Sequence, residues 1–315
     1  MTVEFCGLTL EHPIVNGSGT FDAIAARRAF GDALLADFPF AAFVSKTITL
    51  RPRAGNPPPR LFETPSGMLN SIGLPNKGLD GYLREDLPKL AELPVPLITN
   101  VMGSTAEELG ALVEAVGERD AVAAVELNVS CPNVKTGLDI GAVPAELERV
   151  VRTVRPRTAK PIVVKLTPNT ADVPACARAA EAGGADAVSL INTLRGMALD
   201  PRTRRPRLGA GTGGLSGPAV RPVALAQVAS VAASVSIPVV GMGGIASGRD
   251  ALDFLGAGAA CVAVGTENFR DPAAGRRIAR ELAAVSRNER GFSAGRTRFS
   301  QDRPKSPAKV GKTVK

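Results

Sequence analysis

The sequence predicts an α/β protein built as a (β/α)8 TIM barrel, with long loops over the C-terminal ends of its strands. Three observations lead to this prediction. Short apolar segments alternate with longer segments of helical periodicity along the chain. The apolar segments number eight, which is the number of strands that closes such a barrel. Several of them are nearly continuous in Val, Ile and Leu, as expected of parallel strands that are buried on both faces.

The predicted strands are short apolar runs, and the predicted helices between them are followed by segments rich in glycine or proline. The strands are expected at Pro13–Gly17, Ala41–Thr47, Pro96–Met102, Val122–Val129, Pro161–Leu166, Ala187–Asn192, Ile237–Gly241 and Cys261–Gly265. The helices are expected at Ala23–Phe30, Thr105–Gly117, Pro144–Val154, Val173–Ala182, Pro218–Ala233 and Gly248–Leu255.

Two long segments, Arg51–Pro75 and Arg195–Gly217, lack a helical pattern and are expected to be loops. Loops of this length in a compact domain usually carry function or are disordered. In a barrel they would follow the second and sixth strands. We therefore expect both to overhang the C-terminal face, where the active sites of such barrels lie.

One catalytic domain is expected at residues 1–285, followed by a basic tail at residues 286–315. The tail is poor in large apolar residues and rich in Ser, Pro and Lys, so it is predicted to be disordered. It contains nine Lys or Arg and two Asp or Glu, a charge of +7, which leaves 8 − 7 = +1 for the other 285 residues. It is either a solubilising extension or a docking arm for an acidic partner or nucleic acid.

The composition indicates a soluble cytoplasmic protein without a metal site. The N-terminal segment lacks the basic start and apolar run of a signal peptide, and no apolar stretch is long enough to cross a bilayer. The four cysteines, Cys6, Cys131, Cys176 and Cys261, are far apart, so neither a disulfide framework nor a zinc site is expected. The single histidine, His12, is interpreted as structural.

The residues at the predicted strand ends are mostly amides, lysines and glycines. Glu126 is the main carboxylate, and it lies within a strand. A hydrolase with paired carboxylates is therefore disfavoured, and one histidine gives poor support for a Ser-His-Asp triad. Amides, lysines and glycines instead suit a planar heterocycle that carries a phosphate. Glycine turns after the last two strands, with Gly243, Gly244, Gly265 and Thr266, are placed like the phosphate site of a barrel or are simply tight turns.

Lys46 and Lys165 each lie in an apolar strand, where a charge needs a partner. Either each extends from a strand end to solvent, or it stabilises the negative charge of a reduced flavin. Cys131 follows a strand among polar residues in ELNVSCPNV. Its thiol is either inert or a base, because nearby lysines can lower its pKa and a thiolate can accept a proton from carbon.

Long motifs resemble the dihydroorotate dehydrogenases, in order from about Val3 to about Ala284. They are SKTITLRPRAGNPPPRLFETPSGMLNSIGLPNKG, ELNVSCPNVKTGLDIG, VVKLTPN, VSLINTLRGMALDPRTRRPRLGAGTGGLSGPAVRP, VVGMGGI and VAVGT. The segment from Asn192 to Pro218 resembles the NAD-linked subclass, class 1B, in particular. A cysteine in the SCPN motif separates this subclass from the membrane-bound, quinone-using class, which has a serine there.

The resemblance implies that FMN oxidises dihydroorotate to orotate in de novo pyrimidine (UMP) biosynthesis. Cys131 and Lys46 would be catalytic, with Cys131 taking the proton from carbon 5 while hydride leaves carbon 6 for the flavin. The implied substrate residues are Lys46, Asn70, Ser71, Ile72, Gly73, Leu74, Asn128, Asn133, Asn192 and Thr193. The implied FMN residues are Ser18, Lys46, Thr47, Asn100, Asn128, Lys165, Ile191, Gly217, Gly243, Gly244, Gly265 and Thr266.

The resemblance also implies partners. Members of the subclass form homodimers and work with a second subunit, which carries FAD and an iron–sulfur cluster and passes electrons to NAD. The chain has neither a cysteine cluster for iron–sulfur nor a GxGxxG after a strand, so both groups are expected only on that partner.

Three alternatives stay open on the sequence. A dihydropyrimidine dehydrogenase-like barrel would share FMN and the cysteine base. A tRNA dihydrouridine synthase would need a basic surface, whereas the body here carries only +1 and no nucleic-acid partner is expected. A catalytically silent flavin-binding or interaction protein would use the tail to recruit its partner.

Overall fold

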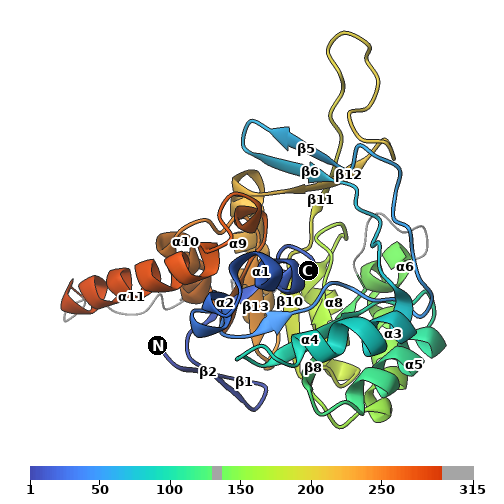
Figure 1. The fold of residues 1–315 in the computed structure, drawn as a ribbon, viewed down its shortest axis with the longest axis horizontal. Coiled ribbons are helices and arrows are strands. Elements are labelled where there is room, and N and C mark those ends of the chain that lie inside the picture. The colour runs from blue at the N-terminus through green and yellow to red at the C-terminus, as the bar shows by residue number, and fades with distance from the viewer. Residues whose placement is uncertain (130–136, 293–315) are drawn as a thin grey trace, which may run out of the picture.

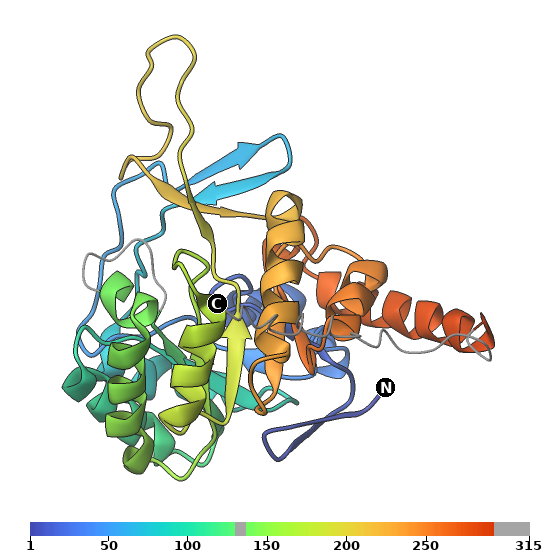
Figure 2. The same cartoon turned by 180° about the vertical axis from the view of Figure 1, so that it is seen from behind.

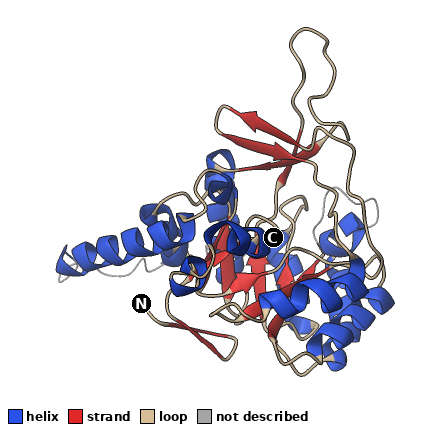
Figure 3. Cartoon of the chain, viewed as in Figure 1, coloured by secondary structure: helices blue, strands red, loops and turns tan. Residues whose placement is uncertain are grey.

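The computed structural model describes residues 1–129 and 137–292. Eight parallel strands form one sheet in the order β3-β14-β13-β10-β9-β8-β7-β4, and helices surround it (Figure 3). The strands are β3 (Ile14–Asn16), β4 (Phe43–Val44), β7 (Leu97–Val101), β8 (Val122–Asn128), β9 (Ile162–Lys165), β10 (Ala187–Leu190), β13 (Val239–Met242) and β14 (Cys261–Val264). The predicted α/β barrel is therefore confirmed, and each strand lies within or next to its predicted segment.

The barrel closes between β3 and β4 through a side chain as well as the backbone. Ala41 N–H donates to the Ile14 carbonyl at 2.9 Å. Beyond this bond, the side-chain amide of Asn16 makes the hydrogen bonds that a neighbouring strand would make. Its Nδ2 donates to the Val44 carbonyl and its Oδ1 accepts from Val44 N–H, both at 2.8 Å. Asn16 is fully buried, so these bonds satisfy polar groups that water does not reach.

The helices are amphipathic and pack their aliphatic residues on the outside of the sheet. They are α1 (Ala23–Phe30), α2 (Ala33–Ala36), α3 (Gly78–Gly81), α4 (Leu87–Leu90), α5 (Ala106–Gly117), α6 (Gly137–Ala142), α7 (Pro144–Val154), α8 (Val173–Ala182), α9 (Arg221–Ala232), α10 (Gly248–Gly256) and α11 (Ala274–Phe292). Four short turns complete them, a π-helical η1 (Tyr82–Asp86) and the 3-10 turns η2 (Arg155–Arg157), η3 (Pro218–Val220) and η4 (Thr266–Phe269). Thr105, Asp172 and Ser247 cap α5, α8 and α10 by accepting a backbone N–H.

A second sheet corrects the expectation that Arg51–Pro75 and Arg195–Gly217 are only loops. They contribute β5 (Leu61–Thr64), β6 (Gly67–Asn70), β11 (Leu194–Gly196) and β12 (Gly213–Ser216), which pair antiparallel in the order β11-β12-β6-β5. This sheet lies over the C-terminal ends of the barrel strands, as was expected of the two segments, and the chain between β11 and β12 projects away from it (Figures 1 and 2). The pairing joins segments far apart in sequence, so neither segment predicts it alone.

An N-terminal hairpin that the sequence analysis missed closes the other end of the barrel. It consists of β1 (Val3–Phe5) and β2 (Leu8–Leu10), on the side opposite the second sheet (Figure 1). Phe5 and Leu10 are buried among interior barrel residues such as Val163 and Val240. The open, functional end is therefore the one under the second sheet.

Helix α11 runs past residue 285, where the predicted catalytic domain ends, and continues to Phe292. Its buried residues Ala274, Ile278 and Leu282 recur every four positions, which is the narrow stripe of a helix with one buried face. None of the helices in the described residues is long and apolar enough to span a bilayer.

Replacing Asn16 with leucine should weaken the barrel at its seam. The variant Asn16→Leu leaves the N–H and carbonyl of Val44 buried without partners, which should lower the free energy of unfolding by about 3 kcal/mol. Urea denaturation measures this change. Thr9→Val, which removes an exposed side-chain hydrogen bond to Glu4 on the hairpin, is the control and should change the free energy of unfolding by less than about 0.5 kcal/mol. Equal effects of the two substitutions would contradict a special role for Asn16.

Candidate active site

A cavity of about 180 Å³ lies between the C-terminal ends of the barrel strands and the second sheet. It is lined by most of the residues that the sequence analysis placed in a site. These are Ser18, Lys46, Thr47, Asn70, Ile72, Gly73, Leu74, Asn128, Lys165, Ile191, Asn192, Thr193, Gly217, Gly243, Gly244, Gly265 and Thr266. The lining residues come from seven barrel strands or the loops after them, and from three strands of the second sheet, β5, β6 and β12; we call this sheet the roof.

Two predicted site residues lie elsewhere, and two fall outside the described residues. Ser71 is fully buried beside the cavity, where its Oγ accepts from Asn56 Nδ2 at 2.9 Å. Asn100 is also fully buried, and its Nδ2 donates to Glu126 at 2.5 Å. Neither lines the cavity, and their contact with a ligand stays a prediction. Cys131 and Asn133 belong to the segment 130–136, which the structure does not describe.

Glycines form one end of the cavity, where backbone atoms approach each other closely. Gly217, Gly243 and Gly244 have φ angles of +87°, +133° and +75°, which favour glycine. A Cβ on Gly244 would lie 2.7 Å from the Gly217 carbonyl oxygen, and one on Gly243 would lie 2.6 Å from Ala224 Cβ. Larger residues would therefore fill or distort this end, where backbone groups from three loops gather as phosphate sites require.

The loops after β3 and β4 supply the adjoining wall. Ser18 Oγ donates to the Ser45 carbonyl at 2.8 Å and lies 3.3 Å from Thr47 Oγ1. Asn128 Nδ2, at the end of β8, donates to the same Thr47 oxygen at 3.3 Å. These side chains are thus oriented by each other before any ligand arrives.

Two lysines face this cavity in different surroundings. Lys46 is exposed to the cavity, but the protein around it lowers its pKa, mainly through desolvation and to a lesser extent through Arg60, against the opposing effect of Asp22. Lys165 is buried, with 7% of its surface exposed, at the end of β9 beside Asn128 on β8. Both lysines could therefore contact a negatively charged ligand in the cavity.

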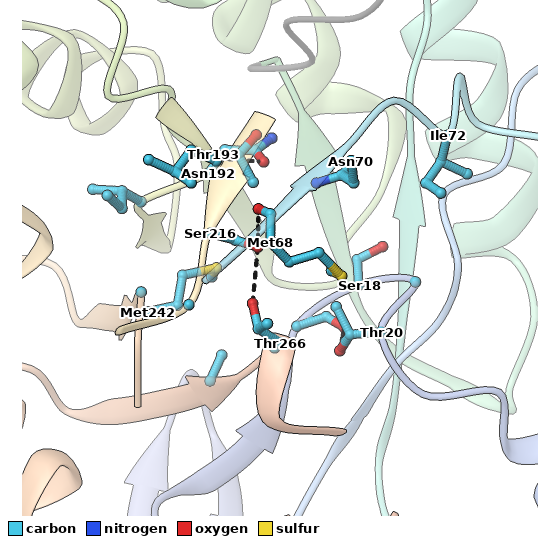
Figure 4. A pocket seen from close by; sticks show the side chains of 18 of the residues that line it. Ser18, Thr20, Met68, Asn70, Ile72, Asn192, Thr193, Ser216, Met242 and Thr266 are labelled. Atoms are coloured by element: carbon cyan, nitrogen blue, oxygen red, sulfur yellow. Dashed lines mark hydrogen bonds between the residues drawn. The ribbon is translucent and has the colours of Figure 1, made fainter. Parts of the chain in front are cut away.

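Amides gather at the other end, beneath β6 and β12. Asn70 Nδ2 donates to the Gly214 carbonyl at 3.3 Å, and Figure 4 shows its side chain on the same side of the cavity as Asn192 and Thr193. Asn169 holds this loop by donating to the Thr193 carbonyl at 2.9 Å. A small flat molecule with donor and acceptor edges suits these groups.

Below the cavity, Glu126 forms a buried polar centre inside the barrel. It is 4% exposed and accepts from Asn100 Nδ2 at 2.5 Å and from Ser189 Oγ at 2.7 Å. Both of its oxygens are thus occupied. Asn100 and Glu126 therefore support the floor of the site from beneath it.

Sequence reasoning missed lining residues from the roof, from β13 and from the loops after β3 and β14. They include Thr20, Leu61, Met68, Leu215, Ser216, Met242 and Phe269. Ser216 matters most, because its Oγ accepts from Thr266 Oγ1 at 2.9 Å and donates to the Met68 carbonyl at 3.3 Å, which joins the roof to the glycine end (Figure 4). Its signal was the GLSGP motif, but only the pairing of β12 with β6 shows where that motif lies.

The described lining residues include no aspartate, glutamate or histidine. They can therefore bind, orient and neutralise a ligand, but they offer no carboxylate or imidazole as a base. The glycines at one end suit a phosphate, and the amides at the other suit a planar molecule with donor and acceptor edges.

Comparisons with known proteins agree with this architecture. The family described as "Dihydroorotate dehydrogenase" matches residues 1–285. The "Dihydroorotate dehydrogenase B (NAD(+)), catalytic subunit" of Citrifermentans bemidjiense is 48% identical over 283 residues, which cover 90% of this chain and 92% of that protein. The protein of the same description from Geobacillus kaustophilus is 48% identical over 86% of both chains.

A solved structure is similar in fold. The crystal structure of DHODH from Eimeria tenella, in complex with ferulenol, has a TM-score of 0.75 and 23% sequence identity, and the match covers 92% of this chain and 85% of that one. The resemblance read from the motifs is thus confirmed by the family match and by relatives of the NAD-linked type. The chain is an oxidoreductase that belongs to the dihydroorotate dehydrogenase family.

Proposed function

We propose that this chain uses FMN to oxidise (S)-dihydroorotate to orotate in the de novo synthesis of UMP. The observation that carries this proposal is a cavity in the described part of the chain that has an end built from glycines, an end rich in amides, and two lysines among its lining residues. Membership of the dihydroorotate dehydrogenase family identifies the reaction to which such a cavity is suited.

The glycine end suits a phosphate, because its lining residues lie in turns after β12, β13 and β14, and the backbone N–H groups of glycine-rich turns bind anions. Gly217, Gly243, Gly244, Gly265 and Thr266 would hold the phosphate of FMN. Ser18, Lys46, Thr47, Asn128, Lys165 and Ile191 would hold the rest of the cofactor, with Asn100 acting from beneath rather than by contact. When bound, FMN supplies the acceptor for the hydride that leaves carbon 6 of the substrate.

The amide end would hold the pyrimidine and its carboxylate. The residues are Lys46, Asn70, Ile72, Gly73, Leu74, Asn128, Asn192 and Thr193, with Ser71 supporting their loop and Asn133 in the segment that the structure does not describe. Neutral amides match the donor and acceptor edges of the ring without adding buried charge.

Cys131 would be the base that removes the proton from carbon 5. In the sequence it comes three residues after Asn128, which is the last residue of β8 and lines the cavity. The described lining residues offer no carboxylate or imidazole for this task. The positive charge of Lys46 would favour the thiolate form.

A partner would carry the electrons onward. The relatives are named as catalytic subunits of an NAD(+)-type enzyme. We infer a second subunit that carries FAD and an iron–sulfur cluster and reduces NAD, and a homodimer of the present chain. The catalytic domain proposed at residues 1–285 would suffice for the half-reaction with dihydroorotate.

The purified chain should carry a flavin that dihydroorotate reduces. Adding dihydroorotate without oxygen should bleach the visible flavin absorbance, because the two electrons of the substrate have no other acceptor. Absorption spectroscopy measures this directly. A bound flavin that dihydroorotate leaves oxidised would contradict the proposed substrate, and dihydrouracil is the comparison that tests for another reduced pyrimidine.

Cys131→Ser should keep FMN but slow its reduction by dihydroorotate by about 100-fold or more at neutral pH, because a serine hydroxyl is a much weaker base than a thiol. Stopped-flow absorbance gives the rate. Cys176→Ser is the matched control, since Cys176 is buried in α8, away from the cavity. Equal reduction rates for Cys131→Ser and the unaltered chain would assign the base to another residue.

Orotate affinity should fall as the pH rises toward the alkaline range, because Lys46 loses its proton. Desolvation lowers the pKa of Lys46 below its ordinary value of 10.5, so this side chain loses its charge at a lower pH than a solvated lysine. The charged form attracts the orotate carboxylate, and deprotonation removes that attraction. Lys46→Arg should bind orotate with less pH dependence, because a guanidinium stays charged.

Titrations of orotate between pH 7 and pH 10, followed by the flavin difference spectrum, test this prediction. Both proteins contain Cys131, so the difference between them reports on Lys46. Identical pH profiles in the two proteins would contradict the role of Lys46 in binding the carboxylate.

A further inference from the structure

Helix α11 binds two loops of the glycine end, those after β13 and β14, from outside the cavity through one side chain. Arg277, in the first turn of the helix, donates from Nη1 to the Ala246 carbonyl at 3.0 Å, two residues after Gly244. Its Nη2 donates to Glu267 at 2.8 Å, next to Thr266. A single guanidinium therefore connects the loop after β13 with the turn after β14.

The position of Arg277 is itself fixed by carboxylates. Its Nε donates to Asp271 at 3.0 Å, and Nη1 also contacts Glu281 at 3.1 Å, one turn along α11. Hydrogen bonding to Asp271, assisted by Glu281, raises the pKa of Arg277. Three acidic side chains surround this cation, Glu267 included, so its charge is already matched and is not free to attract a ligand.

Glu281, which contacts Arg277, also connects α11 to the start of α10. Its second carboxylate oxygen accepts from Gly248 N–H at 2.7 Å, at the start of α10. Gly248 lies so close to α11 that a Cβ there would be 2.3 Å from Leu282 N. Arg277 and Glu281 thus hold residues 246 and 248 on either side of Ser247, which leaves the loop after β13 little freedom to shift.

We propose that Arg277 is a positioning residue for the phosphate end of the cofactor site. The inference rests on the proposed function, in which Gly243, Gly244, Gly265 and Thr266 hold the phosphate of FMN. These groups come from two loops, one after β13 and one after β14. They can bind the same phosphate only if the two loops are held at the right distance from each other. Arg277 does not line the cavity, so it acts only through the backbone that it holds.

The rigid fork of arginine suits this task. Arg277 contacts a carbonyl and three carboxylates in different directions with a planar group whose donors keep a fixed geometry. A lysine has a single ammonium at the end of a flexible chain and would satisfy only part of this set. Arg277→Lys should therefore restore part, and not all, of what Arg277→Ala removes.

Arg276 provides a matched control on the same helix. It is the preceding residue and forms an ion pair with Asp37, after α2, on another side of α11. No contact joins its described partner to either glycine loop. Arg276→Ala therefore removes an arginine and an ion pair from α11 while it leaves the phosphate end in place.

The test compares FMN with riboflavin, which has the same ring but no phosphate. Each flavin is titrated into flavin-free chain by fluorescence quenching, and thermal unfolding of each flavin-free variant is recorded alongside. Arg277→Ala should bind FMN about 10-fold to 100-fold more weakly, as the loss of hydrogen bonds to charged groups predicts, while riboflavin affinity changes by less than about twofold. Arg277→Lys should lie between, and Arg276→Ala should bind both flavins like the unaltered chain.

The outcomes separate the inference from the function on which it rests. Equal weakening of FMN and riboflavin by Arg277→Ala, or equal loss of FMN affinity in Arg276→Ala, would overturn the positioning role and leave the FMN site intact. An unaltered chain that binds neither flavin would overturn the proposed function and this inference together. If Arg277→Ala does not fold, Arg277→Lys carries the same comparison, and an unchanged ratio of FMN to riboflavin affinity in that variant would overturn the inference.

Discussion

The contact on which the rest of the structure depends is the seam between β3 and β4, where Asn16 pairs with both backbone groups of Val44. β4 is only two residues long, so a regular ladder between these strands would be short. Ser18 and Lys46 each lie two residues beyond one of the paired positions. The seam fixes the distance between the starts of the loops after β3 and β4. It therefore also fixes the distance between Ser18 and Lys46 in the cavity wall.

The roof and the barrel each supply a different set of the residues that line the cavity. The barrel supplies the lysines, Asn128 and most of the glycines from the ends of parallel strands, which face the same way by construction. The second sheet supplies Asn70 and Ser216 from antiparallel strands that lie over them. Thr266 and Ser216 hydrogen bond across this boundary at 2.9 Å, and Asn169 accepts from Arg195 N–H of β11 at 3.0 Å, so the second sheet is anchored at both the glycine end and the amide end.

The parts of the fold that could be predicted are those whose signal is local. Buried parallel strands such as β8 and β9 are recognisable as runs of Val and Ile, and α7 and α8 have the predicted bounds. The second sheet could not be found this way. Its strands contain Gly67 and Gly213, where a Cβ would lie 2.1 Å from the Ser216 oxygen and 2.4 Å from the Asn70 oxygen. These glycines lower strand propensity, yet the close approach of the backbones requires them.

The sequence predicted which residues gather near the cavity better than it predicted the contacts that their side chains make. Most of the residues that the motif resemblance implied line one cavity, because the motifs coincide with strand ends. It did not distinguish side chains that face the cavity from those that support it, and Asn100 and Ser71 proved to be buried neighbours. Ser216 and the support from Arg277 depend on tertiary contacts between distant segments, for which a single sequence carries no local signal.

The central claim is that one cavity holds a phosphorylated flavin and a pyrimidine in contact, each at its own end. A crystal structure of the chain grown with FMN and orotate tests this most directly. We predict electron density for the FMN phosphate at Gly243, Gly244 and Gly265, and for orotate at Asn70 and Asn192 beneath the second sheet. Orotate bound outside this cavity, or a flavin phosphate bound away from the glycine end, would contradict the account.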